Sequence, residues 1–550
     1  MKDLRWILML WLLCSDCLSF AQTLTVNTSQ LNFGTVDELN PDSLPLTISN
    51  TIGHDVDVTN LRFYNFYGAP AFSCTQSTFT ITNGSSQTIW IRFAPVHNIY
   101  HNSELVIENN SQRGAVSVDL LAQGHYSNVY YNATENQAEE NLKTQINTIT
   151  GNNYNALLYN PGRDSMFMIL DNKKVNGQGA SVNTLECVYT GRIASGYFDR
   201  TDCQNNDNFN TEHTFPQGYF NSLEPMKSDL HHLFPTDDVA NNTRGNYPFG
   251  VVTNATWTDG GSKFDGNNNI FEPRNVHKGA AARAMMYFVL RYQNYNSFFN
   301  SQEVILKQWN KTYLPSAIEK TRNNKIAQWQ NNRNPFVDYP QFADRITSFV
   351  STSTAVSVNS FDRFNSTIDY GIVNVNFPAI YTFTIVNTGN QNIQLSNFNL
   401  SNGSLLTFVS GGNNSTLAPG EAYKTEIQLL STAVSSITES LTFNTNVSGS
   451  TAVTIPINAN AVVAGIDEAT AGNITIYPSP FSDCFHINSG INLENAIVRL
   501  FSAEGRSVNY IYNSGQFCMD DAALKDGFYM LTVTDKNGNT FSKKLVKTAY

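Results

Sequence analysis

The sequence predicts a multidomain protein in which a central α+β domain is flanked by two β-sandwiches and followed by a small C-terminal β-domain. A length of 550 residues exceeds what one hydrophobic core supports, so several domains of roughly 100 to 200 residues are expected. Only 14% of the residues are charged, while Asn, Thr, Ser and aromatic residues are frequent, which favours β-rich extracellular modules. The net charge of −11 does not by itself indicate a nucleic-acid partner.

Residues 1–21 have the pattern of a secretory signal peptide. Lys2 and Arg5 precede an apolar stretch from Trp6 to Leu13, and Ser19-Phe20-Ala21 is the expected cleavage site. The apolar stretch is too short to span a membrane, and no other segment reaches the length of a membrane-spanning helix. We therefore expect an exported protein without a membrane-spanning segment.

Residues 22–125 and 354–463 are predicted to form two immunoglobulin-like β-sandwiches related by an internal repeat. At an offset of 337 residues, "FGTV" recurs as "YGIV", "LTISNT" as "FTIVNT" and "AVSVDLLAQG" as "AVTIPINANA". Both copies consist of short runs of alternating apolar and polar residues, separated by Gly, Pro and Asn. Such alternation places one face of each strand in a core, as in a sandwich. The two modules resemble accessory sandwiches of secreted bacterial proteins.

Helical periodicity sets residues 126–350 apart from the flanking segments, and it predicts helices over 139–149, 278–293 and 316–330. In the second of these helices, one face carries Ala281, Met285, Phe288 and Tyr292, and the other carries Arg283, Tyr287 and Arg291. In the third, Ser316 and Glu319 have the spacing of a capping box, and Asn334-Pro335 stops the segment that follows. A separate α+β domain is therefore expected between the sandwiches.

Residues 466–550 are predicted to form a small β-domain. Asn537-Gly538 between alternating apolar residues is a strong hairpin signal. With "PSP" at its start, a "GFY" strand and a terminal "KLVK", the segment resembles the C-terminal sorting domain of the type IX secretion pathway, although "PSP" replaces the commoner "PNP". The resemblance implies the type IX machinery as a partner, and secretion by a Gram-negative bacterium followed by cleavage or attachment at the cell surface.

Five cysteines remain after the signal peptide, and none forms a Cys-x-x-Cys pair. In an oxidising compartment such cysteines form disulfides. We expect one bridge between Cys187 and Cys203 and another between Cys484 and Cys518, with Cys74 free.

Polar residues of the central domain gather in a segment predicted to fold as strand, strand and helix. Glu212 and His213 lie in an irregular strand, "NFNTEHTFPQ", and "DLHHLFP" forms the next run. Thr236, followed by two aspartates, is a candidate N-cap, and Gly245 can end a helix that carries Asn241.

This set of residues suits the hydrolysis of a phosphodiester. A neutral imidazole, here that of His213, can take a proton from water near pH 7. A divalent cation neutralises the charge of the transition state, and carboxylate and amide oxygens, here of Glu212 and Asn241, favour Mg²⁺. Because consecutive strand residues point to opposite faces, Glu212 and His213 reach one metal only if the strand bends, and Pro216 makes a bend plausible.

The central domain resembles the bacterial endonuclease I family, which has a ββα-metal (His-Me finger) fold. The motifs that carry the resemblance occur in family order: "EHTFPQ", "MKSDLHHLFPTD", "NNTRGNYPFG", "FEPRNVHKGAAARAMMYF" and "EKTRNNKIAQWQNNRNPFVD". The resemblance implies a secreted nuclease that cuts DNA, and also RNA, with little sequence preference and leaves 5′-phosphate ends. It implies His213 as general base and Glu212 and Asn241 as ligands of Mg²⁺, with Mn²⁺ or Ca²⁺ also fitting the site.

Further residues have expected roles around this site. No counterpart exists for the transition-state arginine of some relatives, so Arg244 is predicted to contact phosphate, and an ion pair with Asp237 or Asp238 stays open. Asp229 and His232 are expected to support the site, and alternation predicts that one of His231 and His232 is buried. Residues 263–345 hold twelve Lys and Arg against six Asp and Glu, which favours a phosphate backbone as ligand. The predicted nucleic-acid contacts are Arg274, His277, Lys278 and Arg283, and a plain position at a helix N-terminus stays open for His277.

Two alternatives remain. A zinc hydrolase could use His213, His231, His232 and His277, but the sequence contains no His-Glu-x-x-His motif. A surface adhesin would use its sandwiches to bind carbohydrate or protein, with an inactive central domain.

Overall fold

The computed structural model describes residues 24–64, 70–293, 297–363, 365–463, 474–489, 497–502, 507–513, 515–519, 525–534 and 540–548. The expected signal peptide, residues 1–21, lies outside these described residues. None of the helices among these residues has the length and apolar character needed to cross a membrane. The chain divides into two compact units, and the C-terminal β-domain belongs to the second.

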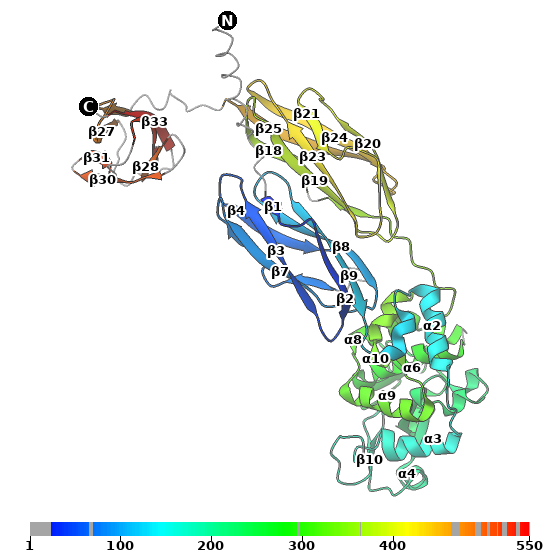
Figure 1. The fold of residues 1–550 in the computed structure, drawn as a ribbon. Coiled ribbons are helices and arrows are strands. Elements are labelled where there is room, and N and C mark those ends of the chain that lie inside the picture. Colours follow the sequence, from blue (N-terminus) through cyan, green and yellow to red (C-terminus); the bar gives the residue numbers. More distant parts are fainter. Residues whose placement is uncertain are drawn as a thin grey trace. The chain divides into compact units, whose positions relative to one another are not determined.

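The first repeat forms two packed β-sheets (Figure 1). One sheet has the order β1 (Leu24–Val26), β3 (Asp42–Asn50), β7 (Ser86–Phe93) and β5 (Phe72–Cys74). The other has the order β2 (Gln30–Asp37), β9 (Val116–His125), β8 (Tyr100–Asn109), β4 (Val56–Phe63) and β6 (Phe79–Ile81). Alternate residues such as Leu46, Ile48, Ile89 and Ile91 are buried in a shared core, as the sequence pattern predicted.

The second repeat has the same strand orders. One sheet runs β17 (Phe361–Arg363), β19 (Ala379–Asn387), β23 (Ala422–Leu429) and β21 (Leu406–Ser410). The other runs β18 (Ile368–Asn374), β25 (Ala452–Val462), β24 (Ser435–Thr445), β20 (Ile393–Leu400) and β22 (Ser415–Leu417). The repeated segments occupy equivalent strands, because β2, β3 and β9 correspond to β18, β19 and β25.

A buried asparagine at the end of β3 and of β19 confirms this equivalence. The Asn50 side chain donates to the carbonyls of His54 and Ile81, each at 2.8 Å. Asn387, which lies 337 residues later, donates to the carbonyls of Gln391 and Leu417 at 2.8 and 2.9 Å. Each amide therefore bonds to two carbonyls at equivalent places in the two sandwiches.

The central domain is mainly helical. Its helices are α2 (Glu139–Gly151), α3 (Tyr159–Ser165), α4 (Arg200–Asp207), α5 (Asp238–Arg244), α6 (Asn275–Tyr292), α7 (Ser297–Asn300), α8 (Glu303–Thr312), α9 (Ala317–Gln330) and α10 (Pro335–Asp338). Its strands are β10 (Thr184–Glu186) with β11 (Ile193–Ser195), β12 (Phe209–His213) with β13 (Leu233–Asp237), and β14 (Trp257–Asp259), β15 (Ser262–Asp265) and β16 (Ile270–Glu272). The three helices predicted from periodicity correspond to α2, α6 and α9.

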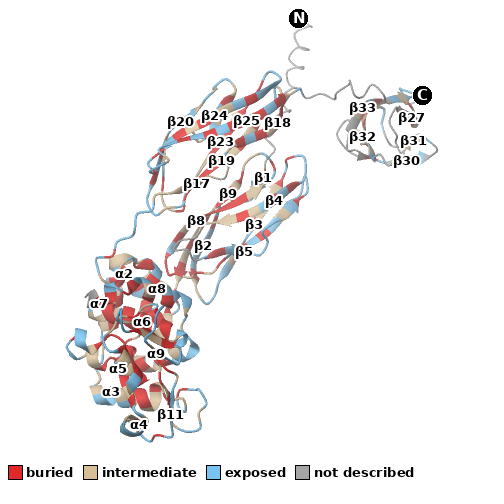
Figure 2. Ribbon diagram, turned by 180° about the vertical axis from the view of Figure 1, so that it is seen from behind, coloured by how far each residue is buried: buried red, intermediate tan, exposed pale blue. Residues whose placement is uncertain are grey.

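Helix α6 is buried on all sides, so the expectation of an apolar and a basic face is wrong. Between His277 and Leu290 every residue except Ala280 is buried, as the red ribbon of α6 in Figure 2 illustrates. Arg283 is only 1% exposed, because its guanidinium forms two bonds to Glu319, at 2.6 and 2.7 Å. A buried arginine with a bidentate carboxylate partner looks, in the sequence, like a surface residue.

The start of α9 agrees only in part with the predicted capping box. The Ser316 hydroxyl accepts a hydrogen bond from the Glu319 backbone at 3.1 Å, as expected. The Glu319 carboxylate, however, binds Arg283 of α6 instead of turning back to Ser316. The helix ends at Gln330 with Asn331 in a left-handed conformation, and Pro335 begins α10.

The C-terminal β-domain contains two four-stranded sheets. Their orders are β26 (Ile474–Tyr477), β27 (Cys484–Ser489), β31 (Gln516–Met519) and β30 (Tyr510–Asn513), and β29 (Ser507–Val508), β28 (Ile497–Ser502), β32 (Gly527–Thr534) and β33 (Thr540–Lys547). Strands β32 and β33 pair as the predicted hairpin, whereas Asn537-Gly538 lies outside the described residues.

One of the two expected disulfides is present. Cys484 and Cys518 face each other across β27 and β31 and are bonded. The expected bridge between Cys187 and Cys203 is wrong, because both thiols are free and buried, and Cys74 is free as predicted. The Cys187 sulfur instead accepts weak hydrogen bonds from the backbone of Thr190 and Asp237, at 3.4 and 3.3 Å.

Candidate active site

Strands β12 and β13 and helix α5 form the frame of the candidate site. The strands are antiparallel, with His213 opposite Leu233 and Phe209 opposite Asp237. Strand β13 leads directly into α5, where the Asp237 carboxylate caps the Ala240 backbone at 2.8 Å. Gly245 ends the helix with a positive φ of 48°. The predicted order of strand, strand and helix is confirmed, with the N-cap at Asp237 instead of Thr236.

His213 lies at the end of β12 in a state suited to a base. Its Nε2 is 3.0 Å from the Lys227 carbonyl, an acceptor, so Nε2 carries the proton and Nδ1 keeps its lone pair. Among the described residues, Nδ1 has no hydrogen-bond partner. Burial, followed by the neighbouring His232, holds the pKa of His213 well below its ordinary value. The ring is therefore neutral at pH 7.

Glu212 is buried beside two partners that lie apart from His213. Its Oε1 accepts a hydrogen bond from the Tyr189 hydroxyl at 2.7 Å and lies 3.1 Å from Nε of Arg244, an ion pair without hydrogen-bond alignment. Burial raises the pKa of Glu212, and Arg244 and Tyr189 oppose that shift. The other oxygen, Oε2, has no hydrogen-bond partner among the described residues, so it is available to a cation.

Arg244 is fully enclosed, which contradicts the predicted phosphate contact. Its guanidinium donates to the carbonyls of Thr214 and Gly245 at 2.6 and 2.7 Å, and its exposure is 0%. The alternative of an ion pair with Asp237 or Asp238 names the wrong acid, because the partner is Glu212. Asp237 instead accepts from Thr190 at 2.7 Å. Tyr189 was missed entirely, since nothing in the sequence links it to Glu212.

Asn241 lies on α5, about one turn before Arg244. Its side chain is partly exposed and makes no hydrogen bond to another described residue. The helix that holds Glu212 through Arg244 therefore also carries an unused amide. Among the described residues, no hydrogen bond or ion pair joins the His213 side chain to that of Glu212 or Asn241. The contacts of Glu212 and of His213 involve different side chains, as expected for consecutive strand residues.

Asp229 and His232 support the segment around His213. One Asp229 oxygen accepts from the His231 backbone and Gln330, at 3.0 and 2.9 Å. The other accepts from the hydroxyls of Tyr287 and Tyr292, each at 2.7 Å. The His232 ring lies edge-on to His213 with centroids 5.5 Å apart.

His231 and His232 are both buried, so the expectation that one of them is buried understates their enclosure. They lie in a 3-10 helix, η6 (Leu230–His232), where the alternation of a strand does not apply. Nε2 of His232 bonds to the Met226 carbonyl at 2.7 Å, and Nε2 of His231 bonds to the Asn332 carbonyl at 3.2 Å. Both rings therefore hold backbone segments in place.

Of the four predicted nucleic-acid contacts, His277, Lys278 and Arg283 are buried and Arg274 is partly exposed. Lys278 binds Glu272 at 2.6 Å, Arg283 binds Glu319, and Arg274 binds Glu186. His277 is 4% exposed between Tyr189 and Phe234, and burial lowers its pKa to about 3. Part of the positive charge of residues 263–345 is therefore used in internal ion pairs. Burial contradicts the expected phosphate contacts of His277, Lys278 and Arg283, whereas that of Arg274 stays a prediction.

The donor set of the frame fits a hard cation. Oε2 of Glu212 and the amide of Asn241 are oxygen donors, which suit Mg²⁺ with several waters retained. Within the part of the chain that the structure describes, no group of three His, Cys, Asp or Glu could hold a metal ion. Of the histidines considered for a zinc site, His213, His231 and His232 each bond to a different backbone carbonyl. The fourth, His277, lies between two aromatic rings.

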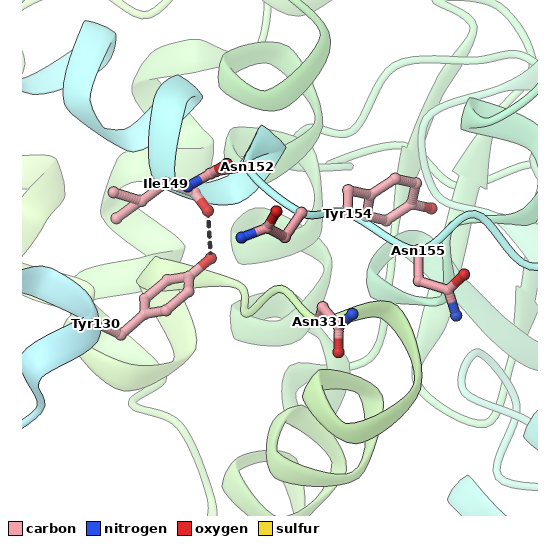
Figure 3. A pocket seen from close by; sticks show the side chains of 7 residues that line it. Tyr130, Ile149, Asn152, Tyr154, Asn155 and Asn331 are labelled. Atoms are coloured by element: carbon pink, nitrogen blue, oxygen red, sulfur yellow. Dashed lines mark hydrogen bonds between the residues drawn. The ribbon is translucent and has the colours of Figure 1, made fainter.

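A pocket of about 900 Å³ lies elsewhere in the domain (Figure 3). It is lined by Tyr130, Ile149, Asn152, Asn153, Tyr154, Asn155 and Asn331. In Figure 3 the Tyr130 hydroxyl bonds to the Ile149 carbonyl, at 2.8 Å. The lining contains no histidine, carboxylate or predicted site residue, so the chemistry of β12 and α5 is separate from this pocket.

Comparison with known families identifies three parts of the chain. Residues 134–341 match the Endonuclease I family, residues 361–460 match the HYDIN/CFA65/VesB-like Ig-like domain, and residues 475–548 match the Secretion system C-terminal sorting domain. The resemblances predicted from the motifs are confirmed. Residues 134–341 are therefore similar to nucleases of the endonuclease I type, and residues 475–548 are similar to the sorting domain of secreted or cell-surface proteins.

Several bacterial nucleases are similar to part of this chain. An "Extracellular ribonuclease" of Bacillus subtilis (strain 168) is 26% identical over 238 residues, which are 40% of this chain and 78% of that protein. One of Bacillus amyloliquefaciens is 31% identical over 156 residues, 25% of this chain and 53% of that protein. An "Extracellular deoxyribonuclease" of Aeromonas hydrophila is 26% identical over 124 residues, 22% of this chain and 54% of that protein. The chain thus spans about half the length of the latter two.

Proposed function

We propose that the endonuclease I domain hydrolyses phosphodiester bonds of DNA and RNA outside the cell in a reaction that depends on Mg²⁺ and leaves 5′-phosphate ends. The protein reaches the exterior through the type IX machinery. The observation that carries the proposal is the bond of His213 Nε2 to the Lys227 carbonyl, which leaves Nδ1 as a free, neutral base.

His213 acts as the general base. Its Nδ1 takes a proton from the attacking water, while the Lys227 carbonyl holds the ring in one tautomer and stabilises the imidazolium that forms. Because burial lowers the pKa of His213, the imidazolium releases its proton readily and the neutral base is restored.

Glu212 and Asn241 would hold the metal ion. When bound, a divalent ion neutralises charge on the phosphate and stabilises the leaving oxygen. Tyr189 and Arg244 fix the orientation of the Glu212 carboxylate and leave Oε2 unused. Mn²⁺ and Ca²⁺ also accept such oxygen ligands, so either can occupy the same site.

Cleavage of both nucleic acids is the first expected result. Similar proteins are named ribonucleases or deoxyribonucleases, and the sequence contains no base-reading motif. Purified protein with Mg²⁺ should degrade plasmid DNA, linear DNA and RNA, and EDTA should stop all three reactions. An adhesin with an inactive central domain would cleave none of them, and a ribonuclease alone would leave both DNA substrates intact.

Asn241→Ala should weaken activity chiefly at low Mg²⁺. Loss of an oxygen ligand lowers metal affinity, so the Mg²⁺ concentration for half-maximal rate should rise by about tenfold or more. Asn242→Ala is the matched control, because Asn242 is the exposed neighbour on the same helix. A loss of rate that is the same at every Mg²⁺ concentration would show that Asn241 is not a ligand.

The rate should stay high at pH 6 and fall at more acidic pH. His213 must be neutral to act, and its pKa is lowered, so protonation begins only below its ordinary range. Glu212 has a raised pKa, so protons compete with the metal as pH falls. Initial rates between pH 4.5 and 8 should therefore show an acid limb that moves to lower pH at higher Mg²⁺. If the acid limb did not move with Mg²⁺ concentration, the fall in rate at low pH would come from protonation of His213 alone.

A further inference from the structure

Three side chains from two separate segments gather beside His213. Tyr159 and Arg163 belong to α3, and Lys227 belongs to the short 3-10 helix η5 (Met226–Ser228). The Tyr159 ring lies 5.7 Å from the His213 ring. The Arg163 guanidinium and the Lys227 ammonium lie 5.0 and 4.5 Å from the centre of that same tyrosine ring. Two cations are thus held near the base by one aromatic platform.

Arg163 is anchored at one end and free at the other. Its Nε donates to the Thr211 hydroxyl at 2.9 Å. Thr211 lies two residues before His213 on β12, so the two side chains share a face of the strand. Among the described residues, no carboxylate forms an ion pair with Arg163, and its two terminal nitrogens make no hydrogen bond. The guanidinium fork is therefore positioned but unused.

Lys227 has the same character. Its carbonyl holds His213, and the ammonium of this half-buried residue has no ion-pair partner among the residues that the structure describes. Several other cations of the domain are paired with acids inside it. Arg200, next to α3 through Asp164, already binds Asp164 and Gln204, each at 2.6 Å. Arg163 and Lys227 are thus unlike the paired cations Arg274, Lys278 and Arg283.

We propose that Arg163 and Lys227 bind the phosphate groups of the nucleic-acid substrate next to His213, with the Arg163 fork on the phosphate that is cleaved. The proposal rests on the proposed function, because it places the substrate at the base. A planar guanidinium matches two phosphate oxygens, whereas an ammonium supplies a point charge. Because Nε is already tied to Thr211, little side-chain freedom is lost when the fork binds phosphate.

The test separates binding from cleavage. In a His213→Ala background with EDTA, the affinity for a fluorescent oligonucleotide duplex is measured between 50 and 300 mM salt for Arg163→Gln, Lys227→Gln and Arg200→Gln. In Arg163→Gln and in Lys227→Gln, the slope of log affinity against log salt concentration should become less steep by about 0.9, the value for one lost phosphate contact. Arg200→Gln, the matched control, should leave the slope unchanged. Unchanged slopes for both Arg163→Gln and Lys227→Gln would overturn the proposal.

Cleavage by the variants with His213 intact gives the second readout. Arg163→Gln should lower kcat/KM by about 100-fold or more, as for loss of a donor to a developing anion. Arg163→Lys, which keeps the charge without the fork, should recover only part of the loss. Full recovery with lysine, or a loss confined to KM, would remove Arg163 from the cleaved phosphate. The unmodified protein could bind the duplex with the expected salt dependence and still fail to cleave it. That result would refute the proposed function but not the phosphate-binding role of Arg163 and Lys227.

Discussion

Replacing His213 with glutamine is expected to remove nearly all nuclease activity while the domain stays folded. Glutamine can still donate to the Lys227 carbonyl, but its amide cannot accept a proton from water near neutral pH. General-base catalysis contributes about 10² to 10⁴ in rate, and the loss should fall in that range. The His213 ring makes its one backbone hydrogen bond through Nε2, so this variant retains the contact that fixes the strand end.

The measurement is the initial rate on plasmid DNA at saturating Mg²⁺, together with thermal unfolding. His231→Gln is the control, because His231 is also a buried histidine bonded to a carbonyl, that of Asn332. It should keep most of the activity. A tenfold loss of rate is smaller than the contribution of about 10² or more that such a base usually makes. If His213→Gln retained more than about a tenth of the wild-type rate, the assignment of His213 as general base would therefore be wrong.

The frame of the site was predictable because its signals are local. The turn-flanked strand around Glu212 and His213, acids at the start of a helix and Gly245 at its end are signals within a few residues of one another, and they predicted β12, β13 and α5. The equivalence of the two sandwiches was predictable for a different reason. Strands that recur at a fixed offset pair with the equivalent neighbours in both copies. The two sandwiches therefore have the same strand order.

The partners of the site were not predictable, because they come from distant parts of the chain. Tyr189 and Glu212 meet only in the fold, as do Arg283 and Glu319. A lysine or arginine in a helical pattern predicts a solvated face, yet the middle of α6 is buried and its Lys278 and Arg283 are paired with acids. Arg163, half-exposed and unpaired, has no feature in the sequence that separates it from Arg200.

Arg244 should prove essential to stability before it proves essential to catalysis. Arg244→Met leaves the buried Glu212 carboxylate without its cation and the Thr214 carbonyl without its donor. Removing one partner of a buried ion pair typically costs about 3 to 5 kcal/mol. Urea unfolding followed by tryptophan fluorescence reports this, because Trp309 is buried in the central core whereas Trp90 of the first sandwich is 58% exposed. If Arg244 contacted phosphate instead, Arg244→Met would lose activity while its free energy of unfolding stayed unchanged.

The double variant Glu212→Gln/Arg244→Met distinguishes the pair from the metal ligand. With neither charge present, no uncompensated ion remains, and Tyr189 can still donate to the amide oxygen. The double variant should therefore be more stable than the sum of the single effects predicts, by about 2 to 3 kcal/mol. Its activity should not return, because the carboxylate that would hold Mg²⁺ is gone. A double variant that regained both stability and cleavage would mean that the Glu212 carboxylate serves only to neutralise Arg244, and the cation would then have to be bound by other oxygens.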